Sequence, residues 1–151
     1  MISKDGPKVI EFNNRFGDPE CQSVLMRMDT DLYDIFDAVI HNKLSDIDIK
    51  WKDERAVTIV LASEGYPGSY PKGRVITGLD AADGADDLVI FHAGTKFDGN
   101  DIVTSGGRVL GASALGKDHD EARAKAYELA KKIHFEGAHF RNDIGLLHST
   151  E

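Results

Sequence analysis

The chain has 151 residues, of which 41% are hydrophobic and 29% charged, which is the balance of a globular protein of one or two domains. Its formal net charge of -8 argues against non-specific binding to nucleic acid, although a small anionic ligand can still bind where a few arginines gather. No apolar run approaches the ~20 residues that a membrane-spanning helix needs.

The first residues predict a hairpin that is cut short. They contain no long apolar segment of the secretory type, and Cys21 is the only cysteine. We therefore expect no internal disulfide and a cytoplasmic location. Asp5-Gly6 is typical of a tight turn, for which only residues 1–3 could form the preceding strand. The chain is expected to begin inside a hairpin, as one part of a longer protein. Residues 8–12 are predicted to form the next strand.

Two helices are predicted after that strand. Asp18 and Pro19 favour a helix start, with an acidic N-cap and proline at the first helical position. The second helix is predicted from Asp31 to about His41. Its apolar residues recur at helical spacing, which predicts a stripe buried in the core: Leu32, Ile35, Phe36, Val39 and Ile40. The composition then becomes polar, and we place a domain boundary near Trp51, between residues 1–51 and residues 52–151.

The second part of the chain is rich in predicted strands. Residues 56–62, 88–92 and 108–115 are compact apolar runs, and residues 97–101 are typical of a hairpin turn. One strong helix is predicted over residues 118–133. Several strands with one long helix indicate an α+β fold, for which we expect a small barrel or sandwich.

A polar trio lies on the first predicted strand. Alternation along an extended chain places Glu11, Asn13 and Arg15 on the same side. Carboxylate and amide oxygens are ligands that Mg²⁺ prefers, and an arginine beside them can hold a phosphate or a carboxylate. The alternative is a polar edge strand that faces solvent. The three residues alone do not decide between these interpretations.

The longer string "EFNNRFGDPECQ" (residues 11–22) resembles the signature of a known family. Residues 15–22 match the R-F-G-D-P-E-x-Q motif of the phosphoribosylamine–glycine ligases, also called glycinamide ribonucleotide synthetases, of the ATP-grasp superfamily. The similarity continues through "IVLASEGYPGSYPKG", "FHAGTK", "TSGGRVLGASALG" and "EARAKAYELAKKIHFEGAHFRNDIG". It covers nearly the whole chain, up to about Leu146.

This resemblance implies a reaction in two steps. ATP would phosphorylate the carboxylate of glycine to an acyl phosphate, and the amine of 5-phosphoribosylamine would then displace phosphate. The products would be glycinamide ribonucleotide, ADP and phosphate. Such chemistry requires positioning and charge neutralisation more than a protein nucleophile. No serine, cysteine and histidine arrangement for nucleophilic catalysis can be recognised in the sequence.

The resemblance also implies residue roles. Glu11 and Asn13 would bind the Mg²⁺ (or Mn²⁺) that bridges the ATP phosphates, and Arg15 would face the transferred phosphate or the glycyl carboxylate. Gly17 would allow a close backbone approach, and Asp18 would face the substrate amine. For Asp18 the alternative is simple stabilisation of a helix N-terminus by an acidic side chain.

The segment "TSGGRVLG" (residues 104–111) is a second candidate site. Two glycines before an arginine could present backbone N–H groups and a guanidinium to a phosphate, as in an anion nest. The alternative is a turn that leads into a core strand. By family resemblance, Arg108 would contact the phosphate of the phosphoribosyl group. Lys72, in "YPKG", is a weaker candidate for the same role.

The resemblance finally implies that this chain is the end of an ATP-grasp domain followed by the family's C-terminal domain. The adenine pocket and the phosphate-covering loop would lie in the missing N-terminal portion, so this chain alone should not catalyse. Two alternatives stay open at this stage. One is an accessory or interaction module that keeps the fold without the reaction, and the other is a different ATP-grasp ligase.

Overall fold

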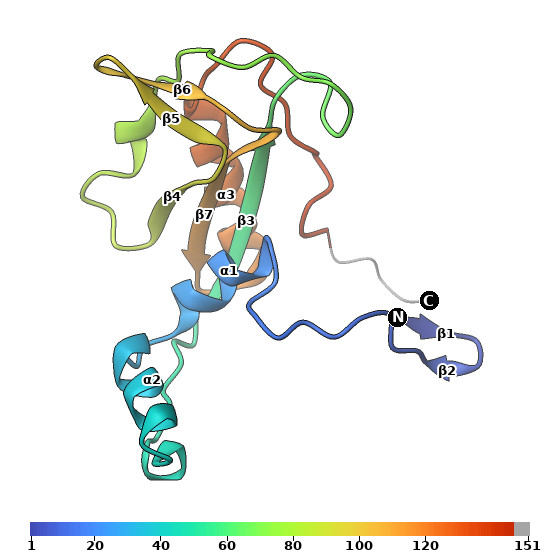
Figure 1. Ribbon diagram of the computed structural model, residues 1–151, viewed down its shortest axis with the longest axis vertical. Helices are drawn as coiled ribbons and strands as arrows, with labels where there is room; N and C mark the ends of the chain where they lie inside the picture. Colours follow the sequence, from blue (N-terminus) through green and yellow to red (C-terminus); the bar gives the residue numbers. More distant parts are fainter. Residues whose placement is uncertain (147–151) are drawn as a thin grey trace.

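The computed structural model describes residues 1–146 and has an α+β architecture (Figure 1). Its centre is a three-stranded antiparallel sheet of order β3-β7-β4, formed by Arg55–Ala62, Arg108–Gly116 and Leu88–His92. Two hairpins lie outside this sheet: β1 (Ile2–Ser3) with β2 (Gly6–Pro7), and β5 (Thr95–Asp98) with β6 (Asp101–Thr104). The helices are α1 (Glu20–Arg27), α2 (Leu32–Ile40) and α3 (His119–Lys132), with 3-10 turns η1 (Leu44–Asp46) and η2 (Leu79–Ala82).

The hydrophobic core lies between the sheet and α3. Side chains alternate along β3, so that Val57, Ile59 and Leu61 all face the same way, into the core cluster. Helix α3 covers this face with small residues such as Ala122 and Ala126, which are fully buried and let the helix approach the sheet closely. The elements predicted over residues 56–62, 88–92, 108–115 and 118–133 are confirmed to within a residue or two.

Helix α1 contacts the opposite face of the sheet through a chain of hydroxyl groups. Thr58 of β3 and Ser113 of β7 are cross-strand neighbours whose oxygens lie 2.8 Å apart. The hydroxyl of Ser23 on α1 lies 2.8 Å from that of Thr58. The two sheet residues are buried, so each hydroxyl needs a partner inside the protein. This chain of contacts fixes where the N-terminal part of the molecule meets the sheet.

The predicted small barrel is not confirmed. Among residues 1–146 the strands form one open three-stranded sheet and two separate hairpins. The β5–β6 hairpin projects beyond the sheet and does not close it (Figure 1). Also within residues 1–146, no helix combines the length and the apolar character that crossing a membrane requires.

Two predictions near the N-terminus are wrong in detail. Residues 8–12 are not a strand: the backbone of Lys8 still pairs with Met1 at the end of the hairpin, but within residues 1–146 the backbone of residues 9–12 has no ladder partner, and the side chains are exposed. Asp18 does not cap α1, whose N-cap residue is Pro19 and which has no side-chain capping bond. The hairpin at the N-terminus does form, with Ser3 and Gly6 as partners.

Helix α2 has the predicted position but not the predicted burial. Asp31 caps it, accepting a hydrogen bond from the amide of Tyr33 at 2.8 Å. Of its apolar stripe, Ile35 is buried, whereas Phe36, Val39 and Ile40 are 51%, 50% and 75% exposed. Periodicity correctly identified the apolar side of the helix, but most of that side is not covered by residues 1–146.

An ion-pair cluster links the start of β4 to α3. Lys125 Nζ lies 2.8 Å from Asp87 Oδ2 and 3.0 Å from Glu121 Oε1. These hydrogen bonds lower the pKa of Asp87 and Glu121 and raise that of Lys125. The pairs therefore stabilise the fold above the pKa of the unfolded carboxyls. That contribution is lost as the pH falls through their lower folded-state values.

Replacing Lys125 by methionine is expected to raise the pKa of Asp87 and Glu121 toward their ordinary values of 3.8 and 4.5. NMR titration of the side-chain carboxyl carbons would measure both. Lys131→Met is the matched control, because Lys131 pairs with Glu128 instead and should leave these two pKa values unchanged. Unchanged values in the Lys125 variant would show that the cluster does not form in solution.

Candidate functional site

The polar trio predicted near the N-terminus lies on an exposed, extended segment. Asn13 Nδ2 donates a hydrogen bond to Glu11 Oε1 at 3.1 Å, so these two side chains do meet. The third member, Arg15, turns away and donates to the carbonyl of Phe16 at 2.8 Å. The structure therefore brings together the side chains of the two predicted metal ligands, whereas the side chain of Arg15 bonds to the backbone instead of joining them.

The Glu11 and Asn13 pair fits part of a magnesium or manganese site. Its carboxylate and amide oxygens are hard ligands of the kind that these ions prefer. Two ligands do not complete an octahedral shell, and no group of three or more His, Cys, Asp or Glu able to hold a metal occurs within residues 1–146. Any further ligands would come from ATP phosphates, water or residues outside this chain.

Asp18 and Arg108, which are 90 residues apart in sequence, form an ion pair. Arg108 Nη2 donates to Asp18 Oδ2 at 2.9 Å, and both side chains remain about half exposed. The pair joins the motif around Gly17 to the first residue of β7. It is the contact that unites the two candidate sites predicted from the sequence.

Close packing of glycines shapes the turn before Arg108. The amides of Ser105 and Gly106 donate to the carbonyl of Gly94 at 2.7 and 3.1 Å, and the amide of Gly94 donates to the carbonyl of Arg108 at 2.9 Å. The Ser63 hydroxyl donates to the carbonyl of Gly106 at 2.9 Å. The predicted anion nest is therefore wrong for Gly106, the first of its two glycines, because the N–H group of Gly106 already has a partner inside the fold.

Aromatic side chains connect Lys72 to the same turn. The ring of Tyr66 packs on Gly107 so closely that a Cβ there would collide with it, and Tyr70 borders the same glycine. The two rings are 6.4 Å apart. Lys72 Nζ lies 5.7 Å from the centre of the Tyr70 ring, within the range of a cation–π contact. Lys72 thus lies beside Tyr70, which borders Gly107, the residue before Arg108.

A mostly apolar cavity of about 370 Å³ lies beside the ion pair. Its lining comes from α1's N-cap, the end of β3, the start of β7 and the segment after α3: Pro19, Val60, Ala62, Tyr66, Arg108, His139, Phe140, Arg141 and Ile144. Arg108 and Arg141 are the two arginines among these lining residues. An apolar hollow with a few charged groups is the usual form of a small-molecule site.

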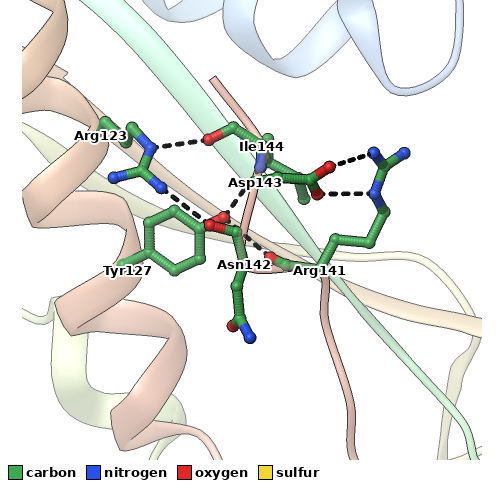
Figure 2. Close-up of polar contacts among 6 residues, drawn as sticks. All are labelled: Arg123, Tyr127, Arg141, Asn142, Asp143 and Ile144. Carbon is green, nitrogen blue, oxygen red and sulfur yellow. Dashed lines mark hydrogen bonds and ion pairs between the residues drawn. The ribbon is translucent and has the colours of Figure 1, made fainter. Parts of the chain in front are cut away.

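Helix α3 holds one wall of this cavity through hydrogen bonds to backbone carbonyls (Figure 2). Arg123 donates to the carbonyls of Ile144 and Asn142 at 2.9 and 2.8 Å. The hydroxyl of Tyr127 donates to the carbonyl of Arg141 at 2.8 Å and accepts from the amide of Ile144 at 3.0 Å. These bonds explain why a segment without regular structure keeps a fixed path.

The side chain of Arg141 is held as well. It forms two parallel hydrogen bonds to Asp143, at 2.8 and 2.6 Å, as Figure 2 shows. Sequence reasoning did not single out Tyr66, His139 or Arg141, although they lie in the strings "EGYPGSYPKG" and "EGAHFRNDIG". No motif spacing marks them, because Tyr66 follows β3 whereas His139 and Arg141 follow α3, and the two segments meet only in the folded chain.

Comparison with known proteins identifies the family. The family model "Phosphoribosylglycinamide synthetase, C domain" matches residues 56–147. This chain belongs to the phosphoribosylglycinamide synthetase family. The region matched by the family model contains Lys72, Arg108 and nearly all of the β3-β7-β4 sheet. Glu11 and Asn13 precede that region.

Full-length relatives extend the similarity to almost the whole chain. It is 53% identical over 146 residues to the phosphoribosylamine–glycine ligase of Vibrio vulnificus strain YJ016. The aligned region covers 96% of this chain and 34% of the relative. The chain is 51% identical to the trifunctional purine biosynthetic protein adenosine-3 of Gallus gallus, covering 14% of that protein. A crystal structure of the phosphoribosylamine–glycine ligase from Thermotoga maritima matches with a TM-score of 0.74 and 35% identity, over 95% of this chain and 35% of that one. The chain thus spans about a third of the ligases it matches.

Proposed function

We propose that this chain is the C-terminal part of a phosphoribosylamine–glycine ligase of de novo purine biosynthesis, working in the cytoplasm. Residues 1–51 would end an ATP-grasp domain, and residues 52–151 would form the C-terminal domain. The observation that carries the proposal is the Asp18–Arg108 pair, because it joins the R-F-G-D-P-E motif to the domain matched by the family model. The missing N-terminal portion would bind most of the ATP.

In the proposed reaction, ATP phosphorylates the glycine carboxylate, and the amine of 5-phosphoribosylamine then attacks the acyl carbon and releases phosphate. Glu11 and Asn13 would present their oxygens to Mg²⁺ or Mn²⁺. That ion, when bound, would neutralise charge on the terminal phosphates of ATP. Arg15, which now bonds only a backbone carbonyl, is free to turn toward the transferred phosphate or the glycyl carboxylate.

The ion pair would serve to place the second substrate. Asp18 can hold a substrate amine by a charge-assisted hydrogen bond, and Arg108 can hold a phosphate in the same way. Both are half exposed, so a ligand carrying both groups could exchange with the pair at small cost. Lys72 would add positive charge from the Tyr70 side. Gly17 carries no side chain, and the Glu20 carboxylate lies over it, 2.5 Å from where a Cβ would stand; a substrate would approach this backbone only after Glu20 turned aside.

The test is glycine-dependent ADP formation with Mg-ATP and 5-phosphoribosylamine. It compares this chain alone with a hybrid ligase, in which this chain replaces the matching C-terminal part of the Vibrio vulnificus relative. We expect no activity from the chain alone and ligase activity from the hybrid. A folded but inactive hybrid would contradict the proposed function, and activity from the isolated chain would contradict the assignment of ATP binding to the missing portion.

A further inference from the structure

Helix α2 is apolar over a wide arc, but only one edge of that arc is covered. Ile35 and Ala38 are 8% and 5% exposed, and the helix packs with η1. Tyr33, Phe36 and Ile40 are 73%, 51% and 75% exposed. Because they are three and four residues apart, these side chains lie along one line on the helix. Together with Val39 they form the surface that we call the α2 face.

The position of the α2 face leaves it open to a large partner. Helix α2 and η1 lie at one end of the molecule, beyond α1 and opposite the β5–β6 hairpin (Figure 1). Most of the large hydrophobic side chains that are exposed in residues 1–146 belong to residues 1–51. In residues 56–146, by contrast, most large apolar side chains are packed in the core between the sheet and α3.

We infer that the α2 face is the surface on which the upstream part of the full-length ligase packs, an inference that rests on the proposed function. The ligases that this chain matches are about three times its length, since it covers 34% of the Vibrio vulnificus enzyme. The family model of the C domain begins only at residue 56, after the α2 face. The α2 face thus belongs to residues 1–51, and under the proposed function the rest of their domain lies upstream.

Charge favours this occupant over a second copy of the chain. Asp34 and Asp37 lie on the side of α2 next to the α2 face and are exposed. Two copies meeting there would bring these carboxylates together, in a protein whose net charge is already -8. An upstream domain can instead offer basic residues at the rim of an apolar patch.

The experiment compares Phe36→Ser in the isolated chain and in the hybrid ligase. Phe36 is half exposed here, so the variant should lower the Tm of the isolated chain less than that of the hybrid. In the hybrid it should lower the Tm by several degrees, because a buried aromatic contact is lost there. Phe97→Ser is the matched control, since Phe97 is 78% exposed on the distant β5–β6 hairpin and should have little effect in either protein.

A second measurement needs no hybrid. Sedimentation velocity would follow this chain mixed with the upstream two thirds of the Vibrio vulnificus enzyme, each part first shown to be folded by circular dichroism. We expect a complex that Phe36→Ser weakens about tenfold or more and Phe97→Ser does not. The inference would be overturned if both variants shifted the Tm equally or if no complex formed. It would also be overturned if the chain associated with itself and Phe36→Ser abolished that self-association. A hybrid that shows the Tm effect without ligase activity would refute the proposed function and leave the surface standing.

Discussion

Glu11→Ala in the hybrid ligase is expected to lower the glycine-dependent rate of ADP formation at least about a hundredfold. Glu11 supplies the carboxylate of the pair that meets at 3.1 Å, and Asn13 offers only a neutral oxygen. Losing several kcal/mol of charge stabilisation in the transition state accounts for a factor of this size, since ~1.4 kcal/mol is tenfold. The Mg²⁺ concentration that gives half the maximal rate should rise as well. Steady-state rates over a range of Mg²⁺ concentrations would measure both effects.

The control for this prediction is Glu54→Ala. Glu54 is also an exposed glutamate, but it lies next to the start of β3 and far along the chain from the motif. Its removal should leave both the rate and the Mg²⁺ dependence as they are. In an active hybrid, equal activity of the Glu11 and Glu54 variants would remove Glu11 from the metal site.

Gly94→Ala is expected to have the largest effect on stability among the changes considered, a loss of about 3 kcal/mol in the free energy of unfolding. A Cβ at this position would lie 2.5 Å from the carbonyl oxygen of Arg108 and 2.6 Å from the Cα of Gly106. Both are backbone atoms, so no side-chain rotation relieves the contact. For a chain of this size the Tm should fall by roughly 6–12 °C. Urea unfolding followed by the fluorescence of Trp51 would measure the free energy.

Gly99→Ala separates close packing from backbone strain. Gly99 has a φ of 60°, but nothing lies within 4 Å of the Cβ that alanine would add. Its variant should cost only about 1 kcal/mol, the usual penalty of a left-handed residue other than glycine. If the two variants are equally stable, the backbones of Gly94 and Gly106 do not approach each other as described.

Local patterns predicted the secondary structure of the second part of the chain well. The runs that became β3, β4, β7 and α3 carry their own periodicity, so the identity of each element follows from its residues. Residues 9–12 have the composition of a strand but no backbone partner within residues 1–146, and a strand exists only through its neighbour. The failed barrel prediction has a similar origin, because the number of strands does not determine whether a sheet closes.

The candidate site was predicted in pieces. Asp18 and Arg108 were each selected from a motif, but no spacing rule connects residues 90 positions apart. The cavity beside them depends on backbone carbonyls after α3 that accept bonds from Arg123 and Tyr127. Such contacts arise from the path of the chain rather than from residue identity. Helix α2 shows the complementary case: periodicity predicted its apolar side, but not that Phe36, Val39 and Ile40 stay exposed within residues 1–146.

The pairing of β7 with β3 also determines the order in which the molecule can assemble during synthesis. Thr58 and Ser113 face each other across the sheet although 55 residues separate them. When β3 leaves the ribosome, its partner β7 has not been translated. The apolar side chains of β3 therefore stay uncovered until more than fifty further residues have been added. Long-range antiparallel pairing of this kind is slow to nucleate. A nascent chain that ends before residue 108 should therefore expose β3 to chaperones, and release from them should follow the emergence of β7.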